Sequence, residues 1–212
     1  MESIADLKKI IHKSQHCQRN WDLSKEIPQE DMDIMLEAIT QCPSKQNKAF
    51  YKVHVITNRE VIEKAHANTV GFGNYLVINE NTAKFEPQTN SQVLANMLVV
   101  FEKYTEDNVQ QHPNPEFAFD TEEVESMDRN TAVGIAAGYL NLSASMLGYS
   151  TGCCGCFQPQ QMKEVLGLDN EPLLLMGVGF PDPDRNRRMH HKDENFKFPT
   201  ITKTPIPTNI IR

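Results

Sequence analysis

The sequence predicts an α+β fold, and three observations support that prediction. Segments in which apolar residues recur at helical spacing alternate along the chain with a few short segments rich in β-formers. The chain has 212 residues, of which 39% are hydrophobic, and this is enough for one substantial core. It shows no internal repeat and no low-complexity tract. We therefore expect a single domain over residues 1–212.

The N-terminal half is expected to contain helices and strands in alternation. A helix is predicted where apolar residues recur every three or four positions, as Met32, Met35 and Ile39 do. A strand is predicted where β-formers alternate with polar residues, as around Val53 and Val55. The expected elements are a helix over 2–13, a helix between Pro28 and the Gln-Cys-Pro at 41–43, a strand over 50–57, a helix over 59–68, a Gly-, Asn- and Thr-rich loop over 69–90, and a strand over 96–101.

The C-terminal half is expected to hold helices, one strand and a tail. Residues 104–126 are acidic and predict a surface insertion, either a lid over a cleft or an excursion without a role. The tail over 196–212 carries several prolines and is expected to be extended. The remaining predicted elements are a long helix over 129–147, a small-residue loop over 148–157, a short helix over 158–166, and a strand over 173–178 closed by a turn at 179–181.

The charge balance and the cysteines exclude several classes of protein. With 21 basic and 28 acidic residues the net charge is −7, which disfavours nucleic acid as a partner. Five cysteines, three of them within Cys153-Cys154-Gly155-Cys156, do not suggest a disulfide framework, so we expect a cytoplasmic protein. Residues 131–162 carry no charge, but their polar residues, glycines and Pro159 predict a buried helix and a loop. A membrane is therefore not an expected partner.

Two polar clusters precede the first predicted strand. Residues 15–21 hold polar and basic side chains, and Arg19 offers a planar fork of donors to a phosphate or a polarised carbonyl. The alternative is a solvated loop that Trp21 anchors to the core. Residues 43–47 gather hydroxyl, ammonium and amide groups, which suit the polar edge of a heterocycle but equally an ordinary polar turn.

Two further clusters lie in the C-terminal third. Small residues over 148–157 would let the backbone approach a flat ligand, and Cys153 and Cys156 form a CxxC. That pair allows a metal or disulfide redox centre, although no second ligand pair is evident, and small thiols that pack under a ligand are the favoured interpretation. Residues 185–192 form a basic run, which is either a phosphate clamp or a solvated surface.

Taken in order, these segments resemble the motifs of the nitroreductase family of flavoproteins. The family follows its opening helix with a basic R-R-S-x-R-x-F-like motif, which falls on residues 15–21 here. Its next helix ends in A-P-S-x-x-N-x-Q-P-W, which corresponds to residues 42–51. Its later motifs, G-L-G-T-x-W-x-G-G-F, L-G-L-P and a strand ending in G-Y-P, correspond to residues 147–157, 166–169 and 179–181.

Some positions depart from the family motifs. Gln15 stands where the family has its first phosphate-binding arginine, Cys17 where it has a serine, and Cys156 where it has the second of two glycines. A bound phosphate would therefore depend more on the basic residues that remain, His16, Arg187 and Arg188.

The resemblance implies a central, mostly antiparallel sheet flanked by helices, in a homodimer with one flavin mononucleotide (FMN) at each of two sites between the subunits. It implies that Arg19 lies near the pyrimidine edge, that the Gly155 backbone amide lies near the ring nitrogen that accepts hydride, and that residues 44–47 come from the partner subunit. No metal ligand is expected. The implied cofactor-binding residues are Gln15, His16, Cys17, Arg19, Ser44, Lys45, Gln46, Asn47, Asn90, Gln92, Cys153, Cys154, Gly155, Cys156, Arg187 and Arg188.

The resemblance also implies an activity. The expected enzyme transfers hydride from NADH or NADPH through the flavin to a nitroaromatic, a quinone or a similar acceptor. The sequence has no GxGxxG fingerprint, which fits a nicotinamide donor that visits the flavin cleft. Two alternatives stay open: a flavoenzyme of the same fold with another task, such as reductive dehalogenation or flavin fragmentation, and a non-catalytic module that binds flavin or metal through Cys153–Cys156.

Overall fold

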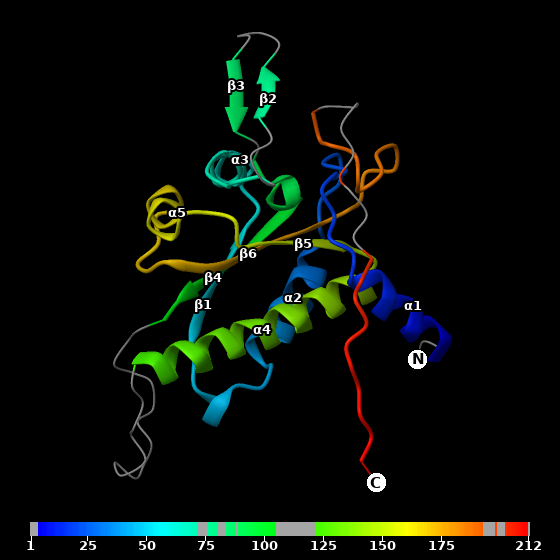
Figure 1. The fold of residues 1–212 in the computed structure, drawn as a ribbon, viewed down its shortest axis with the longest axis vertical. Helices are drawn as coiled ribbons and strands as arrows, with labels where there is room; N and C mark the ends of the chain where they lie inside the picture. The colour runs from blue at the N-terminus through cyan, green and yellow to red at the C-terminus, as the bar shows by residue number, and fades with distance from the viewer. Residues whose placement is uncertain are drawn as a thin grey trace.

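The computed structural model describes residues 4–71, 76–79, 84–87, 89–104, 122–192, 198 and 202–211. These residues form an α+β fold in which a four-stranded sheet lies between helices on its two faces (Figure 1). The strand order is β1-β4-β6-β5, and every pair of neighbours is antiparallel. The predicted α+β class with an antiparallel sheet flanked by helices is therefore confirmed.

The central strand β4 (Met97–Lys103) explains why the sheet forms. Its first six residues are all buried, which fits a continuous apolar run whose two faces are both covered. It pairs with β1 (Tyr51–Ile56) on one side and with β6 (Pro172–Gly179) on the other. The fourth strand, β5 (Ser150–Cys154), pairs with β6 and lies at the edge of the sheet.

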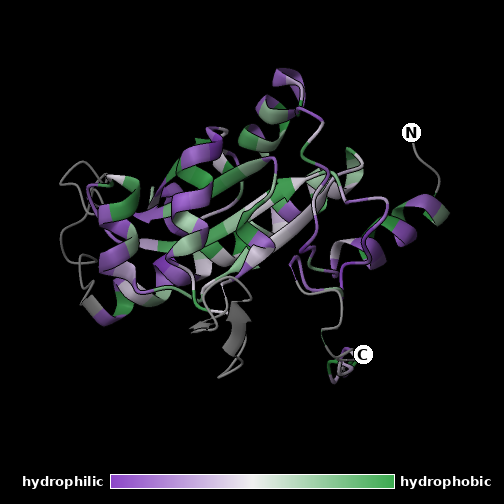
Figure 2. Ribbon diagram, turned by 90° about the horizontal axis from the view of Figure 1, so that it is seen from above, coloured by the Kyte–Doolittle hydropathy of each residue, from purple (hydrophilic) through white to green (hydrophobic). Residues whose placement is uncertain are grey.

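Alternate residues of β4 support two separate cores, one on each face of the sheet. On one face, Met97, Val99 and Phe101 pack with residues of α2 (Gln29–Thr40) and α4 (Glu122–Met146). On the other face, Leu98 and Val100 pack with residues of α3 (Arg59–Ala67) and α5 (Pro159–Leu166). Figure 2 shows hydrophobic residues concentrated in the strands, whereas the helices carry hydrophobic and hydrophilic residues in alternation.

The first helix, α1 (Ile4–Ser14), has none of its residues buried. It is attached near the C-terminal end of α4, where Asn141 Nδ2 donates to the Ser14 carbonyl at 2.7 Å and Lys13 Nζ donates to the Gly148 carbonyl at 3.1 Å. At the other end of the chain, residues 202–211 contain no helix or strand and are exposed (Figure 1). None of the described helices combines the length and the apolar character needed to span a membrane.

The structure corrects three of the predicted elements. Residues 69–90 contain a two-stranded antiparallel ladder, β2 (Leu76–Asn79) with β3 (Lys84–Pro87), because these strands pair with each other and not with the main sheet. Residues 150–154, predicted as loop, form β5, because β6 supplies their backbone partners. The long helix α4 begins at Glu122 and not at 129, so it takes the last five residues of the acidic segment 104–126. Residues 105–121 of that segment lie outside the described residues.

Candidate functional site

The polar cluster at residues 15–21 lies along the free edge of β5. The Gln18 amide donates to the Thr151 carbonyl at 2.8 Å, which extends the backbone pairing beyond the edge strand. The buried Gln18 side chain accepts from the amides of Arg19 and Asn20 at 2.9 and 3.2 Å, so it fixes the turn that follows. Trp21 Nε1 donates to the Ser91 carbonyl at 2.9 Å, which anchors the end of the cluster in the core.

A glycine in β5 allows this close approach. A Cβ atom on Gly152 would lie 2.8 Å from the Gln18 carbonyl oxygen and 2.8 Å from Gln92 Cβ. Real Cβ contacts are not this short, and the Gln18 oxygen belongs to the backbone and cannot swing away. Gly152 is therefore the residue at which residues 15–21, β5 and the turn η2 (Ser91–Val93) come together.

Two thiols meet at this edge. Cys17 and Cys153 both lie along this edge, and each residue is partly buried. The hydrogen bond from Cys153 is the largest cause that lowers the pKa of Cys17 from 9.0 to about 5, against the effect of burial. The Cys153 amide and the nearby charges of Arg19 and Arg187 lower this pKa further. The same contact and burial raise the pKa of Cys153, so Cys17 is the thiol that ionises.

The basic run at residues 185–192 folds back onto the same edge. Asn20 Nδ2 donates to the carbonyls of Asn186 and Met189 at 2.8 and 2.9 Å, and this holds the run against residues 15–21. Of its three arginines, Arg187 faces Cys17 and Arg19. The other two make backbone contacts within the C-terminal region: Arg185 with the His190 and His191 carbonyls, and Arg188 with the Phe198 carbonyl.

Two guanidinium groups therefore converge near one thiol. The Arg19 guanidinium lies 4.6 Å from the centre of the Phe198 ring, which holds it by a cation–π contact. Burial and the charge of Arg187 lower the pKa of Arg19, so the two cations are close enough to repel. A concave surface of about 520 Å³ adjoins this pair, lined by Gln18, Asp182, Pro183, Asp184, Arg185, Asn186 and Arg187. Such a concentration of positive charge in an acidic chain is suited to an anionic ligand.

The other face of β5 presents Cys154 to a different environment. Because side chains alternate along a strand, Cys153 packs against one core and Cys154 against the other. Asn90 Nδ2 donates to Cys154 Sγ at 3.2 Å and to Gln92 Oε1 at 3.1 Å, and burial raises the pKa of Cys154 to about 11. Cys154 is thus a thiol that packs within the core.

The end of β5 is open. Gly155 and Cys156 follow directly after the strand and are exposed. No atom of the described residues lies within 4 Å of the position that a Cβ atom on Gly155 would take, so a flat group can approach the backbone there. Among the described residues, no group of three or more His, Cys, Asp or Glu side chains is arranged to hold a metal ion.

Some predicted site residues are not brought into this cluster. Ser44 and the turn η1 (Lys45–Asn47) lie near the N-terminal part of α4, where Lys45 Nζ pairs with Asp128 Oδ2 at 2.5 Å. Figure 1 shows that this part of α4 is at the opposite end of the helix from α1. Gln15 and His16 lie directly after α1 and are exposed.

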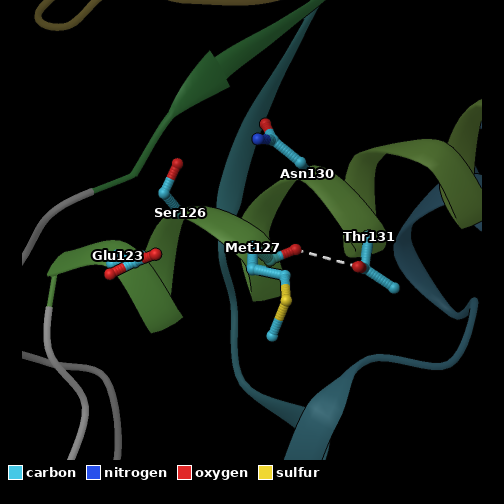
Figure 3. Close-up of a pocket in the computed structure, with 5 residues that line it drawn as sticks. All are labelled: Glu123, Ser126, Met127, Asn130 and Thr131. Atoms are coloured by element: carbon cyan, nitrogen blue, oxygen red, sulfur yellow. Dashed lines mark hydrogen bonds between the residues drawn. The ribbon is translucent and has the colours of Figure 1, made fainter.

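A second concave surface lies on α4 itself. It measures about 600 Å³ and is lined by Glu123, Ser126, Met127, Asn130 and Thr131 (Figure 3). Thr131 Oγ1 donates to the Met127 carbonyl at 2.8 Å, so this hydroxyl is satisfied within the helix. None of the predicted cofactor-binding residues lines this surface.

Sequence reasoning missed the residues that assemble the site. Gln18 and Asn20 lie within the predicted cluster, but their buried backbone-holding roles follow only from the fold. Gly152 was visible as a glycine among small residues, which is the signal for a close backbone approach.

The comparisons with known proteins place the chain among oxidoreductases. The profile of the nitroreductase family matches residues 13–180. The chain therefore belongs to the nitroreductase family, and the resemblance seen in its motifs is confirmed.

Individual relatives agree with this assignment. Over 183 residues the chain is 27% identical to the Bacillus subtilis (strain 168) protein named "Putative NAD(P)H nitroreductase YdgI", covering 80% of this chain and 86% of that one. The crystal structure of a nitroreductase family protein from Clostridium novyi NT superposes with a TM-score of 0.61 at 21% identity, covering 89% and 90% of the two chains. That of a "putative NAD(P)H:FMN oxidoreductase" from Staphylococcus epidermidis superposes with a TM-score of 0.65 at 17% identity, covering 97% and 94%.

Proposed function

We propose that this protein uses FMN to transfer hydride from NADH or NADPH to a nitroaromatic, a quinone or a similar small acceptor. The observation that supports this most directly is the convergence of Arg19 and Arg187 near Cys17 at the edge of β5, in a chain of the nitroreductase family. The name of the Bacillus relative contains NAD(P)H, and that of the Staphylococcus relative contains NAD(P)H and FMN. Both names support the same function.

The chemistry of the available donors fits FMN. A phosphate needs positive charge and N–H donors, which Arg187 supplies. A flat ring needs a backbone without an obstructing side chain, and Gly155 provides one. Cys153 and Cys17 lie between these two features and would contact the ligand between its phosphate and its ring.

When bound, FMN supplies the two-electron hydride chemistry, and the protein supplies position and electrostatics. Arg19 is held by Phe198 and would place a fixed positive charge at the pyrimidine edge, where negative charge develops. The Gly155 amide would orient the ring nitrogen that accepts hydride. Arg187 would hold the phosphate, since Arg185 and Arg188 are already engaged with backbone carbonyls.

The active form is proposed to be a homodimer, and the surface of α4 supports this. A single exposed stripe runs along the helix through Met127, Thr131, Gly134, Gly138 and Leu142. Within the part of the chain that the structure describes, nothing lies within 4 Å of a would-be Cβ on either glycine, so packing among these residues does not require their small size. A second copy whose helix packs closely there would use it.

The dimer also accounts for residues 44–47. They lie away from the guanidinium pair of their own chain, beside Asp128 near the N-terminal part of α4. Pairing of two chains through their α4 helices would bring this polar turn toward the partner's site. Two of its residues, Gln46 and Asn47, hold left-handed backbone with φ of 55°, a strained conformation of the kind found at ligand-binding turns.

An absorption and reduction experiment tests this function. The purified protein, loaded with FMN if necessary, is titrated with NADH and with NADPH under nitrogen, and a quinone is then added. We expect bleaching of the flavin absorption by at least one nicotinamide and recovery with the quinone.

Arg19→Ala should slow the bleaching about 100-fold, because one fixed charge that favours the transition state is lost. A matched control is Lys64→Ala, which removes an exposed charge from α3. If the purified protein did not bind added FMN, the proposal would be refuted.

A further inference from the structure

The Arg19 guanidinium lies against an aromatic ring that comes from a distant part of the chain. Its Cζ atom is 4.6 Å from the centre of the Phe198 ring, a distance typical of a cation–π contact. Arg19 is half-buried, and no carboxylate among the described residues forms an ion pair with it. The position of this guanidinium therefore depends on the Phe198 ring.

The backbone of Phe198 is held on both sides by one other residue. The Phe198 amide donates to the Arg188 carbonyl at 2.6 Å, and Arg188 Nε donates back to the Phe198 carbonyl at 3.1 Å. The ring of the buried His190 lies beside the Phe198 ring, with the two centres 6.0 Å apart. Because both backbone groups are bonded, Phe198 cannot turn its ring away from Arg19 without losing a hydrogen bond.

These contacts form a closed circuit that returns to the residue beside Arg19. Asn20 Nδ2 donates to two carbonyls that flank Arg188 in the sequence, at 2.8 and 2.9 Å. Arg188 in turn holds Phe198, and the Phe198 ring lies against Arg19. The direction of the guanidinium is thus set through three segments of the chain, and it does not depend on the rotamer preference of one exposed side chain.

We propose that Phe198 is a positioning residue for the hydride transfer, since its ring holds the Arg19 guanidinium ready at the pyrimidine edge of the flavin. This inference rests on the proposed function, which assigns that edge to Arg19. Phe198 need not touch the flavin or the acceptor, because it acts through Arg19. A charge that is already ordered when the reaction begins stabilises developing negative charge better than a mobile one.

The proposal distinguishes reduced from oxidised flavin. Negative charge is present at the pyrimidine edge only after reduction, so an ordered Arg19 favours the reduced form. Loss of the Phe198 ring should therefore weaken the binding of reduced FMN more than the binding of oxidised FMN. A residue that only packed against its neighbours would alter both affinities by the same factor.

The first measurement needs no flavin. In the 15N-labelled full-length apoprotein, NMR relaxation of the Arg19 Nε–H group reports how firmly the guanidinium is held, and the signal is assigned by its loss in Arg19→Ala. We expect a rigid group in the wild type and an order parameter below about 0.6, the range of a flexible group, in Phe198→Leu. Phe198→Tyr keeps an aromatic face and should restore the rigid value.

The second measurement compares the dissociation constants of oxidised and reduced FMN. Phe198→Leu should lower the ratio of the oxidised to the reduced constant about fivefold, the size of effect expected for one cation–π contact. Phe198→Tyr should keep the wild-type ratio. In an Arg19→Ala background, Phe198→Leu should cause no further change, because two residues that act as one unit are not additive.

A second cation–π contact in the same chain supplies the matched control. Lys25 Nζ lies 5.3 Å from the centre of the Phe180 ring. Phe180→Leu removes this ring by the same substitution and should leave both the order of Arg19 and the ratio of the two constants as in the wild type. If Phe198→Leu did not fold, Phe198→Met would replace it, since methionine fills a similar volume without a ring.

Two results would overturn the proposal. One is an Arg19 Nε–H group that stays equally ordered after the Phe198 ring is removed. The other is a ratio that Phe198→Leu lowers as much in the Arg19→Ala background as in the wild type. A chain that did not bind FMN would instead refute the proposed function, while the measurement on the apoprotein would still decide whether Phe198 holds Arg19.

Discussion

At the scale of single residues, the site is formed by side chains whose neighbours are set by distant parts of the chain. Arg187 faces Cys17 because Asn20 holds the loop that follows β6. The sequence shows three arginines in that loop and cannot rank them. The structure distinguishes them, since the guanidinium groups of Arg185 and Arg188 each donate hydrogen bonds to backbone carbonyls.

Replacing Arg187 should weaken FMN binding. A charge-assisted bond to a phosphate contributes about 1.5–3 kcal/mol, so Arg187→Ala should raise the FMN dissociation constant about 10- to 150-fold. Fluorescence titration of the apoprotein measures this constant. Lys64→Ala, which changes the net charge by the same amount at an exposed position on α3, should leave it unchanged. Equal affinities for Arg187→Ala and the wild type would remove Arg187 from the site.

One buried and one half-buried histidine predict sensitivity to acid. Burial, together with neighbouring positive charges, lowers the pKa of His66 to about 4 and that of His191 to about 3, from 6.5. The unfolded chain therefore binds protons at a pH where the folded chain does not, so stability is complete above about pH 6.5 and falls as the pH drops toward 4. Urea unfolding at pH 7 and pH 5 measures this loss. His66→Gln should reduce the difference between the two values, whereas His12→Gln, at an exposed position on α1, should preserve it. A wild type that is equally stable at both values would contradict the prediction.

At the scale of elements, a helix or strand could be predicted from the sequence when its own residues specify burial, and could not when it depends on pairing with another segment. β4 and the helices that pack on it were predicted because their own apolar pattern specifies burial. β5 was not, because Ser-Thr-Gly-Cys-Cys shows no alternation and becomes a strand through its pairing with β6. β2 and β3 were missed for the same reason, since each depends on the other. Three of the four predicted clusters, at residues 15–21, 148–157 and 185–192, lie together in the structure, whereas residues 43–47 lie apart from them. The approach of residues 15–21 to β5 depends on long-range pairing that no local pattern encodes.

The close approach at β5 makes Gly152 sensitive to the smallest substitution. Gly152→Ala would press a methyl group against the Gln18 carbonyl and Gln92, and such overpacking costs about 1–3 kcal/mol. Denaturant unfolding measures the free energy. Lys64→Ala, at an exposed position on α3, is the control and should unfold as the wild type does, because surface substitutions usually change stability by less than about 0.5 kcal/mol. If both variants were as stable as the wild type, residues 15–21 would not lie as closely on β5 as described.

At the scale of the whole molecule, a single chain leaves apolar side chains exposed to solvent on two of its helices. Exposed apolar side chains lie on both α1 and α4, among them Ile4, Leu7, Ile11, Met127 and Met146. A surface of this kind on a small protein marks an interaction site. It supports the homodimer that the family resemblance implied.

The dimer can be tested at one glycine of α4. Gly138→Leu should be tolerated within the chain, because none of the described residues lies within 4 Å of the added Cβ, but it would prevent the close approach of a second helix. We expect sedimentation to show half the wild-type mass, together with loss of FMN binding, since residues 44–47 of a partner would be absent. Gln160→Leu adds an equally exposed leucine on α5 and should stay dimeric. An unchanged mass for Gly138→Leu would exclude this face as the interface.

The unburied first helix has a consequence for the order of folding. A helix of 11 residues with no buried side chain lies below the length at which isolated helices persist in water. Its two hydrogen bonds to the region of Asn141 and Gly148 hold only its C-terminal end. In a refolding reaction the sheet should therefore form in a step whose rate is independent of protein concentration. We expect α1 to become ordered only when two chains associate, in a slower, second-order phase whose rate rises with protein concentration.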